Sequence, residues 1–393
     1  MESALPLYKE IKRDLANAYH LPPSEKTALL FVFNPSHELV FADGGGNYTP
    51  PANIARMERE LADFPLIYAG DDDFVLDMST SVITDGKGDE RCPEPDGRLI
   101  PFPWGWNKRV RQQFLKIGGG KWPVPSYEYV ERLRMLANRS FAAEYISRLL
   151  CNVELAGWKG CLVGECMMFH KTVGLADFNE GEWIFKQPWS SSGRGNFTAT
   201  TIDNVTKNRL AGFIRTQGGF LSDKFYHKTL DFALEFYVFS DSSVRFVGYS
   251  VFQAADKGTY GGNLVDSQEN IKAVISEKIG NEALLDALTD AHVNLLRERI
   301  GGLYTGYVGI DMMAVEEHGK TMCHPCVEIN LRMNMGVVAM AAYRRPFFFD
   351  EGGGGGSVVG DSRRSSTLTP SVVRRERGFH TCLNDRFISI RYS

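Results

Sequence analysis

The sequence contains no apolar run long enough to cross a bilayer and no excess of either sign of charge. Its longest apolar runs, Ala28–Phe33 and Val337–Ala342, are far shorter than the ~20 residues that a transmembrane helix requires. The 44 Lys and Arg residues nearly balance the 48 Asp and Glu residues, which gives a formal net charge of −4. Because no strong global field attracts an anionic polymer or surface, we expect neither nucleic acid nor membrane among the partners.

The sequence also lacks the marks of a secreted disulfide scaffold. Its seven cysteines are an odd set at irregular spacing, in a chain of 393 residues. The first twenty residues carry charges where a signal peptide needs an apolar core, namely Lys9, Glu10, Lys12, Arg13 and Asp14. We therefore expect reduced thiols in a cytoplasmic protein. With 43% hydrophobic and 23% charged residues, the composition is that of a soluble globular chain, and its length predicts two or three domains.

Residues 1–120 indicate a small parallel α/β layer. Ala28–Phe33 is a continuous apolar run, as expected for a strand covered on both faces. A Gly-rich loop, a helical stretch at Asn53–Asp63 and a second apolar run at Leu66–Ala69 follow. Strand, loop, helix and strand in this order are typical of a parallel layer. We expect residues 85–107, rich in Gly, Pro and Trp, to be irregular.

After the Gly118–Gly120 break, the pattern changes to α+β. Two helices are predicted first, and short strands dominate from about residue 183 onward. The predicted elements are helices at Tyr127–Leu136, Ser140–Leu150 and Glu282–Arg299, and strands at Trp183–Phe185, Leu234–Phe239, Val244–Ser250, Tyr307–Val315 and Cys326–Leu331. The pentaglycine Gly352–Gly356 and the few apolar residues after it predict that residues 351–393 form a disordered tail.

A lysine followed by small residues is the strongest local signal for a bound anion. Lys186 ends an apolar strand, and the loop after it contains Ser190, Ser191, Ser192, Gly193 and Gly195. Small residues let backbone N–H groups converge on a phosphate, and the lysine adds a point charge. The pattern is not a Walker motif, in which the lysine follows the glycines. A hairpin turn with a solvated lysine is the alternative.

Two later strands carry carboxylates suited to a magnesium ion. In Glu328-Ile-Asn-Leu-Arg332, alternation places Glu328, Asn330 and Arg332 on one face. Asp311 is the one acid in the apolar stretch Gly306–Met313. If the strands pair, Asp311, Glu328 and Asn330 offer three oxygen ligands for Mg²⁺, and the arginine can reach an anionic group. The alternative is a surface strand with solvated charges.

Together these pieces resemble the ATP-grasp superfamily. The likeness lies in the order of a strand lysine, a small-residue loop, a hinge strand, an acid-bearing strand and a Glu-x-Asn strand over residues 120–345. Within the superfamily, Phe33–Glu38, Trp104–Trp106 and Cys326–Gly336 look like an uncharacterised bacterial group. The resemblance implies an ATP-grasp fold preceded by a small α/β domain. It divides the chain into a substrate-binding domain (1–120), a lid subdomain (121–219) and a core with the metal site (220–350).

The resemblance also implies a role for individual residues. Lys186 and Arg139 would bind phosphates, and Ser190–Gly195 would fold over them. Asp223, Lys224 and Tyr226 lie where the superfamily grips adenine, and Asp231 matches the acid that holds the ribose. Asp311, Glu328 and Asn330 would bind Mg²⁺, with Arg332 near the γ-phosphate or the acylphosphate.

Other residues are weaker candidates. His37 and Glu38 follow the first strand, at the edge where α/β layers bind ligands. Arg245 and the loop Gln253–Asn263 look like a cover over the site, so His37, Glu38 and Arg245 are candidate substrate residues. We interpret Cys323 and Cys326 as core thiols rather than half of a zinc site.

The function that this resemblance implies is an ATP-dependent ligase. It would join a small-molecule carboxylate to an amine, or less often a thiol, through an acylphosphate, and would require ATP and Mg²⁺. Two alternatives remain open at this stage. One is a kinase-like phosphotransferase on the same fold, and the other is a nucleotide-binding regulatory protein without turnover.

Overall fold

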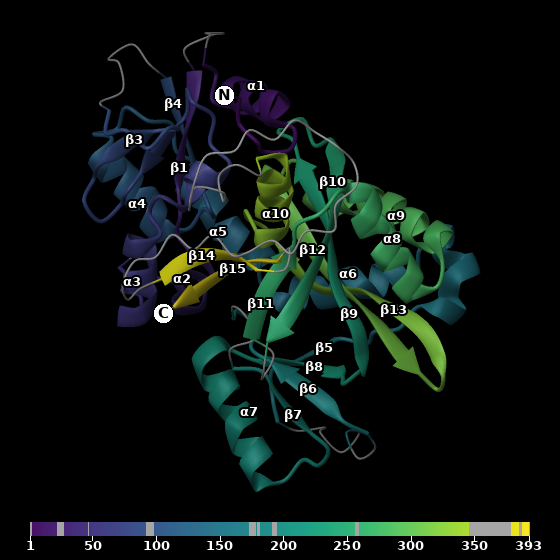
Figure 1. Cartoon of the computed structure of the whole chain (residues 1–393). Helices are drawn as coiled ribbons and strands as arrows, with labels where there is room; N and C mark the ends of the chain where they lie inside the picture. Colours follow the sequence, from purple (N-terminus) through teal and green to yellow (C-terminus); the bar gives the residue numbers. More distant parts are fainter. Residues whose placement is uncertain are drawn as a thin grey trace.

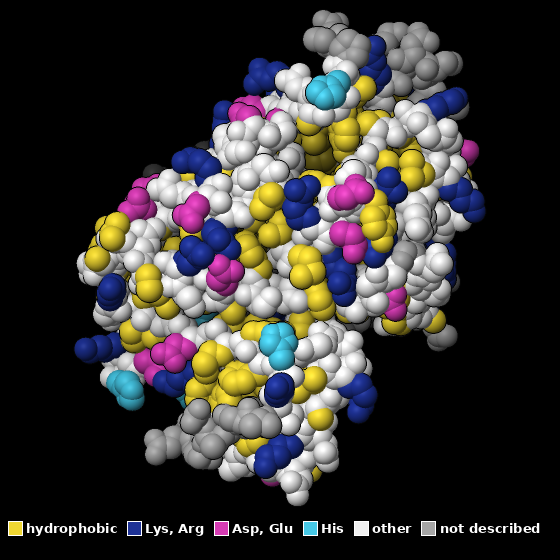
Figure 2. Space-filling view, turned by 180° about the vertical axis from the view of Figure 1, so that it is seen from behind, with side chains coloured by type: hydrophobic (Ala, Val, Ile, Leu, Met, Phe, Trp, Pro, Cys, Tyr) yellow, Lys and Arg dark blue, Asp and Glu magenta, His cyan; other side chains and the backbone are white. Residues whose placement is uncertain are grey.

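Among the residues that it describes, the structure, a computed structural model, contains three sheets (Figure 1). It describes residues 2–21, 27–45, 47–91, 98–172, 178, 181–190, 195–255, 259–345, 379–384 and 387–392. No helix among these residues is long and apolar enough to cross a membrane. On the face shown in Figure 2, both signs of charge are interspersed, and hydrophobic side chains line a hollow.

The N-terminal sheet is the predicted parallel layer. Its order is β3 (Ile83–Asp85), β2 (Phe74–Leu76), β1 (Thr27–Val32) and β4 (Arg98–Pro103), with β1 parallel to both of its neighbours. All six residues of β1 are buried, which is why its sequence is continuously apolar. The helices of this region are α1 (Tyr8–Ala18), α2 (His37–Asp43), α3 (Ala52–Glu60) and α4 (Lys108–Ile117).

Two predictions for this layer were wrong. Leu66–Ala69 is not a strand, because Phe64–Ile67 forms the 3-10 helix η1, which contains Pro65. The strand that pairs with β1 on this side is instead β2, which begins seven residues after the last residue of η1. The region 85–107 is not wholly irregular either, since β4 pairs along the whole length of β1 despite its two prolines.

The second sheet is small and antiparallel. It has the order β5 (Met167–Phe169), β8 (Phe220–Lys224), β6 (Trp183–Lys186) and β7 (Phe197–Ala199). The amphipathic helix α7 (Asn204–Gln217) packs on it through Leu210 and Phe213. Lys186 is the last residue of β6, so the loop that follows begins at the end of this strand.

The third sheet is the largest and carries the acidic residues. Its order is β13 (Lys320–Asn330), β12 (Gly306–Glu317), β9 (Lys228–Val238), β10 (Val244–Ala255), β11 (Thr259–Leu264), β15 (Phe387–Tyr392) and β14 (Phe379–Asn384). Around it lie α5 (Tyr127–Leu136), α6 (Arg139–Leu150), η2 (Val153–Cys161), α8 (Gln268–Ile279), α9 (Glu282–Ile300) and α10 (Met335–Arg344).

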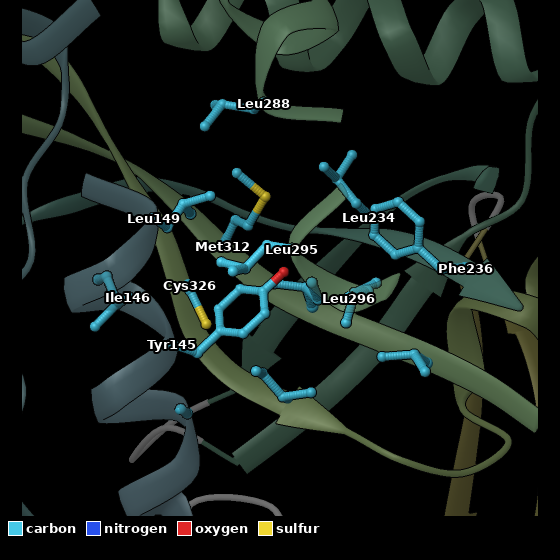
Figure 3. Close-up of a cluster of buried hydrophobic side chains, with 14 of the residues drawn as sticks. Tyr145, Ile146, Leu149, Leu234, Phe236, Leu288, Leu295, Leu296, Met312 and Cys326 are labelled. Atoms are coloured by element: carbon cyan, nitrogen blue, oxygen red, sulfur yellow. The ribbon is translucent and has the colours of Figure 1, made fainter. Parts of the chain in front are cut away.

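Alternation along β9 and β12 separates the two faces of this sheet. Phe232, Leu234 and Phe236 join the apolar core beneath α6, α8 and α9, together with Met312 and Cys326 (Figure 3). The residues between them point to the other face. The opposite face carries the acids as well as Tyr237 and Tyr307, which belong to a second apolar core with α10.

The tail differs from its prediction. Residues 351–378, on which most of this prediction falls, lie outside the described residues, whereas Phe379–Asn384 and Phe387–Tyr392 pair as antiparallel strands and are not disordered. β15 pairs with β11 through Asn263 and Leu264, and Ile388 is buried. The open edge of β11 supplies hydrogen-bond partners that the tail's composition does not reveal.

Candidate active site

Lys186 lies in a buried polar cluster at the end of β6. Its Nζ is 3.6 Å from Oδ2 of Asp223 on the neighbouring strand β8, and both side chains are almost fully buried. The same carboxylate oxygen lies 3.2 Å from Nε2 of His324, on β13. Burial alone would raise the pKa of Asp223, but the His324 hydrogen bond and the charge of Lys186 hold it below its ordinary value. Asp223 therefore stays ionised and balances the lysine.

The acidic residues meet on the polar face of the large sheet. Asp311 on β12 lies directly opposite Glu328 on β13, and Asn330 donates a hydrogen bond to Asp311 Oδ2 at 3.1 Å. Burial and the charges of Glu328 and Glu235 raise the pKa of Asp311 well above its ordinary value. Three oxygen-bearing side chains from two paired strands thus face the same space.

Arg139 joins the lysine loop to the acidic strand. It is the first residue of α6, and the Asn138 side chain caps this helix by accepting a hydrogen bond from the Ser140 amide. Its guanidinium donates to Glu328 Oε1 at 2.7 Å, to the Gln187 carbonyl at 3.0 Å and to the Ser190 hydroxyl. The loop after Lys186 and the Glu-x-Asn strand are therefore in contact through one arginine.

Cys326 on β13 is a buried thiol near Lys186, Asp311 and Glu328. Burial is the main cause that raises the pKa of this thiol well above its ordinary value. The charges of Asp311, Lys186 and Glu328 also affect this pKa. Cys323 and Cys326 are both buried in the apolar core. Among the described residues, no group of three or more His, Cys, Asp or Glu side chains is placed to hold a metal ion.

Arg332 connects this site to the N-terminal layer. Its Nη2 donates to Asn330 Oδ1 at 3.0 Å, its Nη1 donates to the Met333 carbonyl at 3.0 Å, and its Nε contacts Glu38 of α2. Burial lowers the pKa of the adjacent His37 to about 4, so this imidazole is neutral near pH 7. A pocket at this junction is lined by His37, Glu38, Arg139, Ser190, Glu328, Asn330 and Arg332, among others.

The remaining candidates lie elsewhere or outside the described residues. Arg245 points to Glu10 of α1, at 3.6 Å, and does not line the pocket at Arg332, which is contrary to its predicted place over the site. Asp231 pairs with Lys228 at 2.5 Å, and Lys224 pairs with Glu317 at 2.8 Å. Tyr226 is buried against the ring of His324. Ser191, Ser192 and Gly193 lie outside the described residues, whereas Gly195 is described and has a positive φ of 81°.

The sequence analysis missed Glu235, a fully buried acid on β9. It accepts hydrogen bonds from Asn334 Nδ2 at 2.6 Å and from Ser250 Oγ at 3.0 Å, and burial raises its pKa to about 7. Asn334 in turn caps α10 by accepting from the Val337 amide. An acid in an otherwise apolar strand was the available signal, as it was for Asp311.

Because Glu235 is held in place, we expect the substitution of glycine by alanine to change the free energy of unfolding in opposite directions in two helices. A Cβ at Gly336 of α10 would lie 2.1 Å from Glu235 Oε1, and two hydrogen bonds hold that carboxylate in place. We expect Gly336→Ala to lower the free energy of unfolding in urea by about 1–3 kcal/mol. At Gly212 of α7 the nearest atom is 4.0 Å away, so Gly212→Ala should raise it by up to about 1 kcal/mol. Equal changes in the free energy of unfolding at both positions would show that the Glu235 side chain moves easily to make room for the added methyl group.

Comparison with known proteins shows similarity in structure only. No model of a protein family matches the sequence, and no curated protein matches it. Solved structures that it resembles include biotin carboxylase from Campylobacter jejuni (TM-score 0.41, 14% identity, covering 62% of this chain and 54% of that one). D-alanyl-alanine synthetase A from Vibrio cholerae matches with a TM-score of 0.41 and 9% identity over 81% of this chain and 92% of that one. N5-carboxyaminoimidazole synthetase from Staphylococcus aureus matches with a TM-score of 0.37 and 10% identity, over 80% and 77%. The chain spans only about half the length of the biotin carboxylase.

The topology agrees with the resemblance that the motifs predicted. A parallel α/β layer precedes a small antiparallel sheet ending in Lys186, and a larger antiparallel sheet carries Asp311 and Glu328. The predicted combination of α/β and α+β organisation is confirmed. The described part of this chain therefore combines one sheet that contains parallel strands with two antiparallel sheets.

Proposed function

We propose that this protein is an ATP-dependent ligase that joins a carboxylate to an amine through an acylphosphate. The observation that supports the proposal is that Arg139 contacts both Glu328, which lies opposite Asp311, and the loop that follows Lys186. A magnesium–polyphosphate complex requires cationic side chains for its phosphates on one side and acidic side chains for its metal ion on the other. In this proposal residues 121–219 cover the nucleotide, residues 220–350 hold the metal, and residues 1–120 bind the acid.

The cationic residues would bind and orient the phosphates of ATP. Lys186 would exchange part of its contact with Asp223 for a phosphate oxygen, and Arg139 would approach from the start of α6. The loop Ser190–Gly195 would supply backbone N–H groups to the same phosphates. Asp223, Lys224 and Tyr226, with Asp231 on β9, would form the nucleoside end of the site, although in the described structure the side chains of Lys224 and Asp231 are engaged in ion pairs.

The acidic face fits a magnesium ion by the chemistry of its donors. Asp311 and Glu328 offer carboxylate oxygens from paired positions of two strands, and Asn330 adds an amide oxygen, which are the ligands that Mg²⁺ prefers. When bound, the metal would neutralise charge on the phosphates during transfer. Two carboxylates and an amide leave room for phosphate oxygens and water, which usually complete the coordination of this ion.

The chain's own residues would work by positioning and by charge. A carboxylate oxygen of the acid would attack the γ-phosphorus, and the bond between that phosphorus and the bridging oxygen of ADP would break. Arg332, beside Asn330, would stabilise the charge on the transferred group. The amine nitrogen would then attack the acyl carbon, phosphate would leave, and the amine would lose a proton.

This function can be tested by measuring ADP release while each reaction component is omitted in turn. We expect ADP and phosphate to form only when ATP, Mg²⁺, a carboxylic acid and an amine are all present, with an amide as the product. A panel of acids, with hydroxylamine as a general amine, would detect the acylphosphate as a hydroxamate. A phosphoester product would instead indicate a phosphotransferase. Tight ATP binding by calorimetry without turnover on any acceptor would indicate a regulatory nucleotide-binding protein.

A further inference from the structure

A histidine from the large sheet reaches the buried lysine of the small sheet. Lys186 and Asp223 lie on the paired strands β6 and β8, whereas His324 lies on β13. The exposed fractions of these three side chains are 7%, 2% and 0%. Asp223 contacts both of the other two side chains. The proposed phosphate-binding lysine is therefore connected to the large sheet through one carboxylate and one imidazole.

The carboxylate of Asp223 contacts the histidine and the lysine unequally. Its Oδ2 accepts a hydrogen bond from His324 Nε2 at 3.2 Å, whereas Lys186 Nζ is 3.6 Å from the same oxygen. Because an ionised carboxylate can only accept, Nε2 carries the hydrogen. The distance to Nζ is too long for a hydrogen bond, although the opposite charges still attract each other. The lysine is thus held near the carboxylate without giving it an N–H group.

The imidazole of His324 is held in one orientation by its neighbours. The ring of Tyr226 lies edge-on to it, with ring centroids 5.7 Å apart. Gly164 lies so close that a Cβ at this position would be 2.7 Å from His324 Nε2. The segment before Gly164 is fixed in turn, since the Val163 amide donates to the Cys323 carbonyl at 2.9 Å. These contacts leave the ring little freedom to turn away from the carboxylate.

Packing alone does not explain a histidine at this position. Its Nδ1 is buried and has no hydrogen-bond partner among the described residues. A buried polar atom without a partner destabilises a fold, and an apolar side chain of similar size would avoid that cost. What the ring gains in return is the hydrogen bond from Nε2 to Asp223. The role of His324 therefore lies in what this bond does to Asp223.

We propose that His324 is a positioning residue for ATP binding, which occupies Asp223 and so leaves the N–H groups of Lys186 free for phosphate oxygens. This inference rests on the proposed function, because that function assigns Lys186 to the phosphates. Without the histidine, the ammonium group would close on the carboxylate and form a direct buried ion pair. A phosphate would then have to break this pair, and separating buried charges is costly. His324 thus acts through Asp223 and Lys186 and does not touch the nucleotide.

Removal of the imidazole should weaken binding of the phosphates and spare binding of the nucleoside. We expect His324→Leu to raise the Kd of ATP and ADP about 10- to 100-fold and that of adenosine less than about threefold, because the lost hydrogen bond is to a charged group that acts only on the phosphate end. Calorimetry on the full-length protein measures the nucleotides, and competition with ADP measures adenosine. His324→Met replaces the leucine variant if that variant does not fold. Equal losses for ADP and adenosine would show that His324 only shapes the site and would overturn the inference.

Two variants separate this effect from general damage to the core. His324→Gln places an amide N–H near the position of Nε2 and should recover most of the affinity for ATP. His292 is another fully buried histidine, on α9, and its ring nitrogens contact the Tyr145 hydroxyl and the Pro325 carbonyl. We expect His292→Leu to lower the midpoint of thermal unfolding but to leave the Kd of ATP within about twofold of the natural value. No recovery in His324→Gln would contradict the role of the N–H group.

A combination with Asp223→Asn tests the route of the effect. In this background Lys186 faces no carboxylate, so adding His324→Leu should change the Kd of ADP by less than about threefold. The full loss in this background would show that His324 acts by another route, and the inference would be wrong. If the natural protein binds ATP but joins no acid to an amine, the proposed reaction is wrong and the inference stands. If the natural protein binds no ATP, both are wrong.

Discussion

Replacing Lys186 with methionine should lower kcat/KM for ATP by about 100- to 1,000-fold, the cost of removing one well-placed charged donor from a transferring group. Methionine keeps most of the side-chain volume in this buried place and removes only the charge. Asp223 keeps its hydrogen bond to His324 in the variant, so a folded protein is expected. Steady-state ADP release and calorimetric ATP binding would measure the loss.

Two companion variants make this result specific. Lys186→Arg keeps the charge but changes its shape, and we expect it to recover only part of the activity, because a fork replaces a point charge in a tight cluster. Lys207→Met removes an exposed lysine from α7, in the same part of the fold, and should leave turnover within about twofold of the natural protein. If Lys186→Met releases ADP at an unchanged rate, the assignment of the cationic residues in the proposed site is wrong.

Removal of an acidic ligand should have an effect of similar size but a different signature. We expect Glu328→Gln and Asp311→Asn each to lower kcat by about 100-fold or more, because a neutral ligand holds Mg²⁺ less firmly beside the phosphates. The diagnostic measurement is a magnesium titration of ADP release. Its midpoint should move to a concentration about tenfold higher in each variant, and a chelator should abolish turnover in the natural protein.

The control for this experiment lies on the same strand. Glu316 is an exposed acid of β12, five residues beyond Asp311, and Glu316→Gln should leave both the rate and the magnesium midpoint unchanged. Glu328 also pairs with Arg139 at 2.7 Å, so its loss could act through the arginine instead of a metal. A lower rate with an unaltered magnesium midpoint in both Glu328→Gln and Asp311→Asn would contradict the metal assignment.

The sequence alone predicted those features that depend on near neighbours in the chain. Alternation placed Glu328 and Asn330 on one face, because successive side chains of a strand point to opposite faces. The continuous apolar run of β1 predicted a strand buried on both faces. The strand that carries Lys186 and the helices α5, α6 and α9 were also predicted nearly to their ends, since their periodicity and caps are local.

Where neighbouring segments decide the structure, the prediction failed. Leu66–Ala69 is as apolar as a strand, but the turn at Pro65 and the position of β2 left no place for it in the sheet. The hairpin at residues 379–392 pairs because β11 offers an open edge, which no property of the tail itself indicates. Arg245 was expected over the site, yet the strand that carries it places it beside α1.

By itself, the sequence determined which chemical groups this protein offers: a strand lysine, a loop of small residues, and acids with an amide at strand spacing. Only the tertiary structure decided which groups face each other. The pairing of Asp311 with Glu328 depends on the register of two strands, and the contacts of Lys186 with Asp223 and of Glu38 with Arg332 join segments far apart in the chain. The physical reason is that side-chain periodicity is set by the local backbone, whereas a contact across the fold is set by the packing of whole elements.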